Sequence, residues 1–396
     1  MNIRHDFEVL KNNPNYIYVD SACMSLRPTK VVNKILEYYN QYPVCAGRSN
    51  HALSNKLNIE IKLARKVVRK FINARSEEEI VFTKNTTEGL NLVAESFGLC
   101  EGDAVLIGDK EHNSNLVPWL RMRDKGIKVL ILKTNDDGTF NMSGFQSILD
   151  RPELKLISLH YSSNVDGVEI PVKEITKLAH SKGIKVLIDA AQAAPHKVID
   201  VKDLDVDFLA FSGHKMMGPS GIGVLYGKKE ALDKLQPFLV GGETVKDTTH
   251  SSVEYETGPE KFEAGLQHYG GIVGLGEACK YLMKIGLKKI AAHEIKLNQI
   301  ITEGLKNEVT IIGPQDAYLR GGIFNFYIEG MDMHNFATIL DSSARIMTRS
   351  GQHCVHSYYN DRKLPVSCRI SLYAYNTEEE AKKIVEEVKE TIRLLK

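Results

Sequence analysis

Short apolar runs alternate with helical patterns from Glu79 to Gly227, and this alternation constrains the fold more than any other feature of the sequence. Strands that alternate with helices form βαβ units and a mainly parallel, doubly wound α/β sheet. Ligands of such sheets bind at the carboxyl ends of the strands, so functional residues are expected there. The apolar runs are EIVFT, DAVLIG, KVLILK, KLISLHYS, KVLIDAA, DFLAF and GIGVLY.

After about Gly265 the pattern changes to long amphipathic helices, then two strand-like runs, GGIFNFYI and CRISLYAY, and a charged C-terminal helix. A chain of 396 residues is too long for one ordinary core, so a second domain is expected. We predict a large domain over residues 15–265 and a smaller α+β domain over residues 266–396, which residues 1–14 join.

The overall charge is nearly balanced, with 51 basic and 50 acidic residues. This balance favours a small-molecule substrate over nucleic acid or a membrane surface. The N-terminus has no apolar signal region and no segment matches a membrane span, so a cytoplasmic protein is expected. Six cysteines without a CxxC pair predict free thiols, with neither a metal site nor a disulfide framework.

Lys215 lies in the insert SGHKMMGPS, between the apolar runs DFLAF and GIGVLY. A lysine in a turn is usually solvated, since lysine is rarely buried. Here small residues, together with Ser212 and His214, favour a cramped place where the amine loses part of its hydration. An amine whose pKa is lowered in this way is a usable nucleophile, so the pattern predicts a Schiff-base lysine.

Thr86 and Thr87 follow the run EIVFT and begin a helix with Glu88 in its first turn. Free N–H groups and hydroxyls at a helix N-terminus suit a phosphate, although the same pattern also describes a plain N-cap. Ser212 and His214 at a neighbouring strand end favour the phosphate site.

Four more polar residues follow predicted strands: His112, Asn164, Asp189 and Gln192. The ring of His112 can stack on a flat cofactor, and Asn164 can donate to a ring oxygen. A buried carboxylate such as that of Asp189 needs a partner, and a protonated pyridine nitrogen would be one. With Lys215 and the phosphate site, these residues predict a pyridoxal phosphate site.

The chain resembles the class V aminotransferase family of fold-type I pyridoxal phosphate enzymes, and within it the SUF-type cysteine desulfurases and selenocysteine lyases. The most specific segments are DFLAFSGHK and RSGxHC. The resemblance extends over nearly the whole chain, and the matching segments are YVDSA, KNTTEGLNL, EHNSNLVPW, SNVDG, VLIDAAQAAPH, DVDFLAFSGHKMMGPSGIGVLYG, KFEAG, RSGQHCVHS and CRISLYAYNT.

The resemblance implies that Cys354 is the nucleophile and that Arg369 clamps the substrate carboxylate. It places Arg349 near the substrate and lets Arg48 reach it across a homodimer. The residue types agree, because a thiol in a Gly- and His-rich loop can form a thiolate and a guanidinium fork fits a planar carboxylate.

The implied reaction converts L-cysteine to L-alanine and leaves a persulfide on Cys354. Lys215 would move the Cα proton, Asp189 would keep the ring nitrogen protonated, and His112 would complete the catalytic group. The sulfur would pass to an acceptor or scaffold protein for iron–sulfur cluster assembly, and L-selenocysteine would react by the same scheme.

Three alternative functions can be distinguished from the desulfurase reaction. Another class V enzyme, such as an aminotransferase or a β-eliminating lyase, would make Cys354 incidental. A nicotinamide dinucleotide enzyme needs a GxGxxG turn after a strand, which GGIVGLG does not supply. A non-enzymatic scaffold with the same fold would have neither cofactor colour nor turnover.

Three segments depart from the family pattern. Leu266 stands in GLQH, where the family has GTPN with a threonine that touches the other subunit's phosphate. Gly47 replaces a histidine beside Arg48, and YVDSA continues as CMSLRP in place of small residues. These departures affect the expected dimer contacts and substrate preference, and they leave the cofactor site intact.

Overall fold

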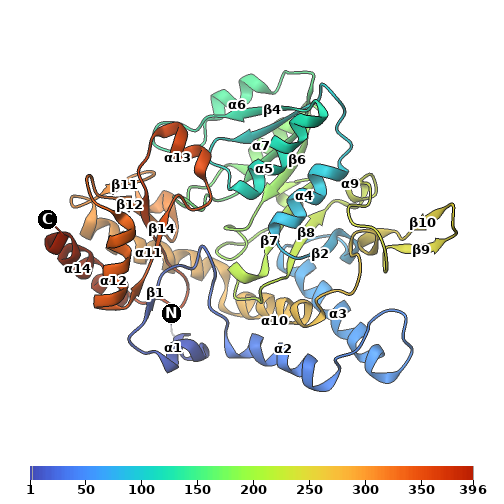
Figure 1. Ribbon diagram of the computed structural model, residues 1–396, viewed down its shortest axis with the longest axis horizontal. Helices are drawn as coiled ribbons and strands as arrows, with labels where there is room; N and C mark the ends of the chain where they lie inside the picture. The colour runs from blue at the N-terminus through green and yellow to red at the C-terminus, as the bar shows by residue number, and fades with distance from the viewer. Residues whose placement is uncertain (2, 396) are drawn as a thin grey trace.

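Seven strands form the central sheet, in the order β2, β8, β7, β6, β5, β3, β4 (Figure 1). The computed structural model describes residues 1 and 3–395. Neighbouring strands pair in parallel except that β8 runs antiparallel to β2 and β7, which confirms the mainly parallel doubly wound sheet. The strands are β2 Ile80–Thr83, β3 Ala104–Gly108, β4 Lys128–Leu132, β5 Leu154–His160, β6 Lys185–Asp189, β7 Phe208–Ser212 and β8 Gly223–Gly227.

Helices follow these strands in the chain, as the alternating pattern predicts. They are α4 Thr86–Ser96, α5 Asn113–Met122, α6 Met142–Ile148, α7 Val172–Ser181, α8 Val201–Leu204 and α9 Lys229–Leu232. Two longer helices, α2 Thr29–Gln41 and α3 Ala52–Phe71, both pack against a third, α10 Tyr269–Ile285. Short 3-10 turns, among them η4 Gly213–Lys215, lie between the larger elements.

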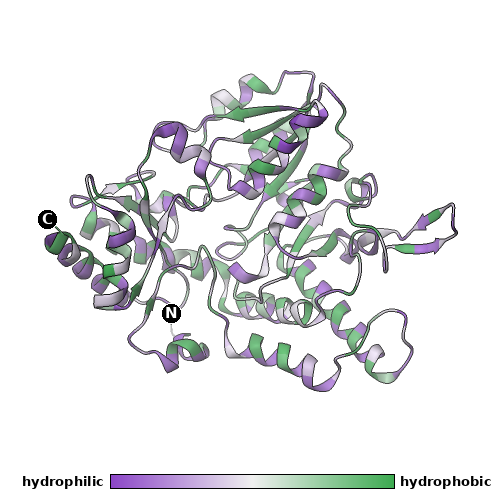
Figure 2. Cartoon of the chain, in the orientation of Figure 1, coloured by the Kyte–Doolittle hydropathy of each residue, from purple (hydrophilic) through white to green (hydrophobic). Residues whose placement is uncertain are grey.

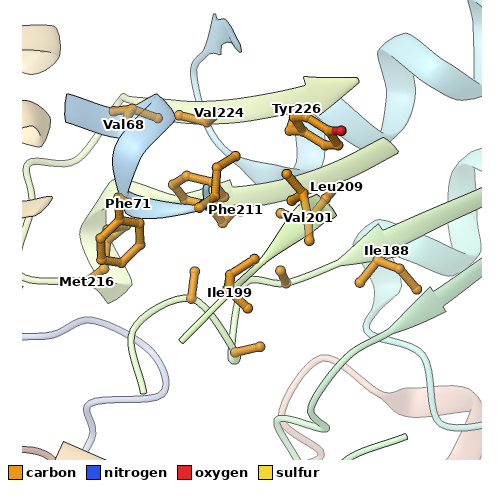
Figure 3. Close-up of a cluster of buried hydrophobic side chains, with 14 of the residues drawn as sticks. Val68, Phe71, Ile188, Ile199, Val201, Leu209, Phe211, Met216, Val224 and Tyr226 are labelled. Atoms are coloured by element: carbon orange, nitrogen blue, oxygen red, sulfur yellow. The ribbon is translucent and has the colours of Figure 1, made fainter. Parts of the chain in front are cut away.

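The central strands are buried on both faces, so their sequences read as continuous apolar runs (Figure 2). On one face, residues of β6, β7 and β8 belong to one buried apolar cluster with Val68 and Phe71 of α3 (Figure 3). On the other face, Phe208 and Leu225 pack with Leu90 of α4. Each fully buried large apolar side chain stabilises the fold by roughly 1.5–3 kcal/mol. Strand ends anchored in this way hold polar side chains in fixed places.

A second, antiparallel sheet has the order β11, β12, β15, β14 and its own apolar core. Its strands are Thr310–Ile311, Ile323–Tyr327, Ser367–Ser371 and Arg349–Gly351, and its helices are α11 Leu287–Leu305, α12 Met333–Ala344 and α14 Glu378–Leu395. Helix α13, His356–Arg362, follows β14. Near the N-terminus, after α1 Glu8–Asn12, strand β1 Ile17–Tyr18 pairs in parallel with β13 Ile346–Met347.

The division at residue 265 stays a prediction. Helix α10 lies beyond it, yet Ile272 and Leu275 of α10 belong to the core of the large sheet. Conversely, Ile17 and Val19 pack in the core of the smaller sheet.

A hairpin of β9 Val245–Thr248 and β10 Val253–Tyr255 projects from the large sheet's side of the molecule (Figure 1). Within the described residues, no helix has the length and apolar character needed to span a membrane.

Candidate active site

A cavity of about 230 Å³ lies at the carboxyl ends of β5, β6 and β7, where residues of the smaller sheet meet them. Every predicted site residue except Arg48 lines it. From the large sheet and its helices come Thr86, Thr87, His112, Asn164, Asp189, Gln192, Ser212, His214 and Lys215, and from the later part of the chain come Arg349, Cys354 and Arg369.

The N-terminus of α4 forms one wall of the cavity. Asn85 caps the helix, because its side chain accepts a hydrogen bond from the Glu88 N–H at 3.0 Å. The Thr86 N–H donates to Ser212 Oγ at 2.8 Å, and the two hydroxyls lie 2.6 Å apart. Thr87 contacts Ser114 in the same way, at 2.7 Å. Converging hydroxyls at a helix N-terminus suit a phosphate group.

Lys215 ends the short turn η4 directly after β7 and lines the cavity. Burial lowers the pKa of its ammonium group, and the nearby Asp189 carboxylate opposes that shift. The unprotonated amine, which is the nucleophilic form, is therefore more populated at a given pH than in a solvated lysine.

Asp189 ends β6 and is 5% exposed. Its Oδ1 accepts a hydrogen bond from the Ala191 N–H at 2.9 Å, which leaves Oδ2 available to a donor in the cavity. Burial raises the pKa of this carboxyl group, while Lys215 opposes the shift. A cationic nitrogen in the cavity would restore the carboxylate, because an opposite charge favours the ionised form.

His112 caps helix α5, and its Nδ1 accepts a hydrogen bond from the Ser114 N–H at 3.0 Å. Burial, reinforced by the positive charges of Lys215 and Arg369, lowers its pKa to about 3. The ring is therefore neutral near pH 7. His214 is neutral too, because burial and Lys215 lower its pKa to about 4.

Arg369 and Arg349 are cross-strand partners in β15 and β14 and present two guanidinium groups to the cavity. Arg369 is 2% exposed and donates to the Asn164 carbonyl at 2.8 Å and to Asp20 Oδ1 at 3.2 Å. Burial lowers the pKa of Arg369, with Asp20 opposing and Arg349 adding to the shift. Two adjacent cations at one wall favour an anionic ligand group such as a carboxylate.

Cys354 lies in the turn between β14 and α13 and lines the cavity. His353 and Cys354 have φ values of +50° and +60°, a left-handed conformation that costs non-glycine residues of order 1–3 kcal/mol each. The turn is held by hydrogen bonds from Asn164 Nδ2 to the His353 carbonyl at 2.7 Å and from the Asn113 N–H to the Cys354 carbonyl at 2.8 Å. These hydrogen bonds hold the turn in its left-handed conformation, and the turn directs the thiol into the cavity.

The structure adds residues that the sequence interpretation missed. His160 lies beside Asp189 in the sheet register and hydrogen-bonds to the buried Glu111 at 2.8 Å. Burial opposes protonation of His160, but the Glu111 carboxylate raises its pKa overall. The signal for this pair was a histidine at the end of KLISLH, in the same position along its strand as Asp189.

Cys23 also lines the cavity and was not predicted as a site residue, so the cavity holds a second thiol besides that of Cys354. Arg349 Nη1 donates to Cys23 Sγ at 2.8 Å, while Nη2 of the same group lies 3.8 Å from Cys354 Sγ. The signal was the departure CMSLRP, which puts a cysteine where the family has a small residue.

Arg48 and Leu266 lie away from this cavity. Arg48 is exposed and 3.8 Å from Glu243, and Leu266 is 72% exposed. Their roles across a dimer stay predictions.

In the described part of the chain, no group of three or more His, Cys, Asp or Glu side chains is arranged to hold a metal ion.

The donor set fits pyridoxal phosphate. The start of α4 suits the phosphate, Asp189 suits a pyridinium nitrogen, and Lys215 suits an aldehyde carbon. Gln192 adds a buried Oε1 that has no hydrogen-bond partner among the described residues, although its Nε2 donates to the Ala22 carbonyl at 2.7 Å. A polar group of this kind favours a ligand that supplies a donor.

Comparisons with known proteins identify the family of the chain. Residues 17–384 match the family described as aminotransferase class V. A probable cysteine desulfurase of Halalkalibacterium halodurans is 39% identical over 387 residues, which cover 96% of this chain and 94% of that protein. The apo structure of a Thermococcus onnurineus cysteine desulfurase has a TM-score of 0.95 at 38% identity, covering 100% of this chain and 98% of that one. The Escherichia coli cysteine desulfurase CsdA, in an S-sulfonic acid form, has a TM-score of 0.92 at 31% identity with the same coverage.

Proposed function

The chain belongs to the class V aminotransferase family of pyridoxal phosphate enzymes, and we propose that it takes sulfur from L-cysteine and releases L-alanine. The desulfurase relatives match nearly the whole chain, which supports this reaction over amino transfer or β-elimination. The observation that carries the proposal is the thiol of Cys354, which lines the same cavity as Lys215 and lies 3.8 Å from Nη2 of Arg349.

Thr86, Thr87, Ser212 and the N-terminus of α4 would hold the cofactor phosphate, and Asp189 would hold the ring nitrogen. Bound pyridoxal phosphate supplies an electron-accepting ring that weakens the Cα–H bond of an amino acid. His112, whose ring is neutral, and Asn164 both line this cavity, and their ring and amide would contact the cofactor.

The remaining residues act on the substrate. Arg369, supported by Arg349, would bind the carboxylate through its guanidinium fork. Lys215 Nζ would take the Cα proton and later return a proton to carbon. The Cys354 thiolate would attack the substrate sulfur, so that an S–S bond forms, the Cβ–S bond breaks and a persulfide remains on Cys354.

Replacement of Cys354 tests this proposal directly. Cys354→Ser should keep the cofactor, because Lys215, Asp189 and Arg369 are untouched. It should lose alanine formation by at least about 100-fold and carry no persulfide, since a hydroxyl is a poor thiophile and is not ionised near neutral pH.

The measurement is alanine and protein-bound persulfide after addition of L-cysteine, with Cys45→Ser, at an exposed cysteine, as the control. Alanine formed at the wild-type rate by Cys354→Ser would contradict the proposal and favour a class V enzyme in which this thiol is incidental. The same assay with L-selenocysteine tests the second substrate.

The protein is also proposed to act as a homodimer. Large apolar side chains are exposed on α2, on α3 and in residues 239–266, and we assign them to the proposed interface because exposed apolar patches mark interaction sites. They include Leu36, Tyr39, Ile59, Leu63, Val240 and Leu266. Arg48 lies between α2 and α3, which supports its predicted contact with a partner's cavity.

The persulfide must leave the enzyme. We propose an acceptor or scaffold protein for iron–sulfur cluster assembly as its destination, since a persulfide transfers its outer sulfur to another thiol without an added oxidant. The predicted cytoplasmic location and the absence of nucleic-acid and membrane partners stay predictions from composition.

A further inference from the structure

Two thiols, Cys354 and Cys23, contact one guanidinium group in the cavity, and the proposed reaction uses only the first. We propose that Cys23 is a second sulfur-accepting residue, which takes the outer sulfur from the Cys354 persulfide. This inference rests on the proposed function, because the sulfur first has to reach Cys354.

Arg349 contacts both sulfur atoms through the two ends of its guanidinium group. Nη1 lies 2.8 Å from Cys23 Sγ, and Nη2 lies 3.8 Å from Cys354 Sγ. A persulfide extends the Cys354 side chain by a further S–S bond of about 2 Å, which carries the outer sulfur into the space that both thiols line. Of the six cysteines, Cys45 and Cys100 are exposed elsewhere, and Cys279 and Cys368 are buried.

The segment that carries Cys23 is anchored on both sides of the cavity. Ser21 Oγ lies 2.7 Å from the Tyr375 hydroxyl, after the smaller sheet's β15. Ser25 Oγ donates to the His214 carbonyl at 3.1 Å and accepts from the Met217 N–H at 2.7 Å, on either side of Lys215 in the chain. The thiol between these anchors is therefore fixed in place, as a transfer residue requires.

The transfer is balanced without a co-reactant. The Cys23 thiolate attacks the outer sulfur of the Cys354 persulfide, a new S–S bond forms to Cys23, and the bond to Cys354 breaks. Cys354 leaves as a thiolate and takes up the proton that Cys23 released. Arg349 contacts both sulfur atoms, so it can stabilise negative charge on either one during the exchange.

The consequence is a free Cys354 while one sulfur is still stored in the cavity. Without an acceptor, the enzyme should therefore form about two alanine molecules per chain in its first burst, one for each thiol. Cys23→Ser and Cys23→Ala should form about one, since only Cys354 remains. The alanine variant is included because a serine hydroxyl can still accept a hydrogen bond from Arg349.

The first experiment maps persulfides by mass spectrometry after the holoenzyme reacts with L-cysteine alone. We expect persulfide on the Cys23 and Cys354 peptides of the wild type, on the Cys354 peptide of the Cys23 variants, and on neither peptide of Cys354→Ser. Persulfide on Cys354 with none on Cys23 in the wild type would overturn the inference and leave the proposed function standing. A wild type that forms neither alanine nor persulfide would contradict the proposed function, and the inference would fall with it.

A second experiment needs no turnover. Dibromobimane, which fluoresces when it bridges two thiols, should link Cys23 to Cys354 in the full-length protein. The fluorescent bridge should be lost in Cys23→Ser and in Cys354→Ser and kept in the control variants Cys45→Ser and Cys100→Ser. Absence of the bridged peptide from the wild type would overturn the inference.

Discussion

Asp189 and Gln192 each bind the protein's own backbone with one polar atom and have a second one left for a ligand. Asp189 Oδ1 accepts from the Ala191 N–H, and Gln192 Nε2 donates to the Ala22 carbonyl. A buried polar atom without a partner costs about 1–3 kcal/mol, which a ligand's donor can offset. Both side chains are therefore oriented before a cofactor binds.

Lys215 is the residue whose loss should be most visible. Lys215→Ala should reduce turnover by at least about 100-fold and abolish the visible absorbance of the covalently linked cofactor, because the amine is gone. Lys197→Ala is the matched control, since burial lowers the pKa of Lys197 to about 8 although it lies outside this cavity. Absorbance spectra before and after borohydride give the result. An unchanged visible band in Lys215→Ala would refute the assignment.

Asp189→Asn should keep the fold and lower kcat by about 100-fold, because a neutral amide does not favour a protonated ring nitrogen. Asp109→Asn is the control. Asp109 is also buried at a strand end, and burial raises its pKa, but it lies outside the cavity. The measurement is kcat at saturating cofactor for both variants. Equal activity of the two variants would mean that Asp189 only supports the structure.

At the scale of elements, the ends of parallel strands explain which site residues the sequence could predict. Asp189 ends β6 and Lys215 follows the adjacent strand β7, and parallel strands bring their carboxyl ends to one edge. Cys23 follows no strand of this sheet, and its contact with Arg349 joins positions 326 residues apart, so the only signal for it was the departure CMSLRP. The role of Arg349 itself came from the family resemblance, since no strand pattern placed it in the cavity.

Gly223 at the start of β8 lets the N-terminus of α4 approach the sheet. A Cβ at this position would lie 2.7 Å from Asn85 Cα and from the Phe211 carbonyl, both backbone atoms that cannot move away easily. Gly223→Ala should lower the free energy of unfolding by about 1–3 kcal/mol and weaken cofactor binding, because the phosphate-binding turn shifts.

Gly242→Ala is the matched control for Gly223→Ala, since a Cβ at residue 242 has no neighbour within 4 Å. Denaturant unfolding and a cofactor titration measure the two effects. If Gly223→Ala were as stable as Gly242→Ala and bound cofactor equally well, the proposed steric role would be wrong.

At the scale of the whole molecule, the cavity forms only where two separately packed sheets meet. The large sheet provides Asp189 and Lys215, and the smaller sheet provides Arg349 and Arg369. The sequence predicted both sheets, because each has its own apolar pattern. It could not assign α10, since an amphipathic helix shows that one face is buried without showing against which sheet.

The homodimer can be tested at Leu266, which is 72% exposed beside the apolar surfaces of α2 and α3. Leu266→Asp should weaken association by at least about tenfold, or roughly 1.4 kcal/mol, because a charge would have to be desolvated at the interface. Leu394→Asp, at a leucine that is 67% exposed on α14, is the matched control and should leave association unchanged. Sedimentation over a concentration series measures both dissociation constants. Equal dissociation constants for Leu266→Asp and the wild type would remove this surface from the interface, and a wild type that stays monomeric would refute the homodimer.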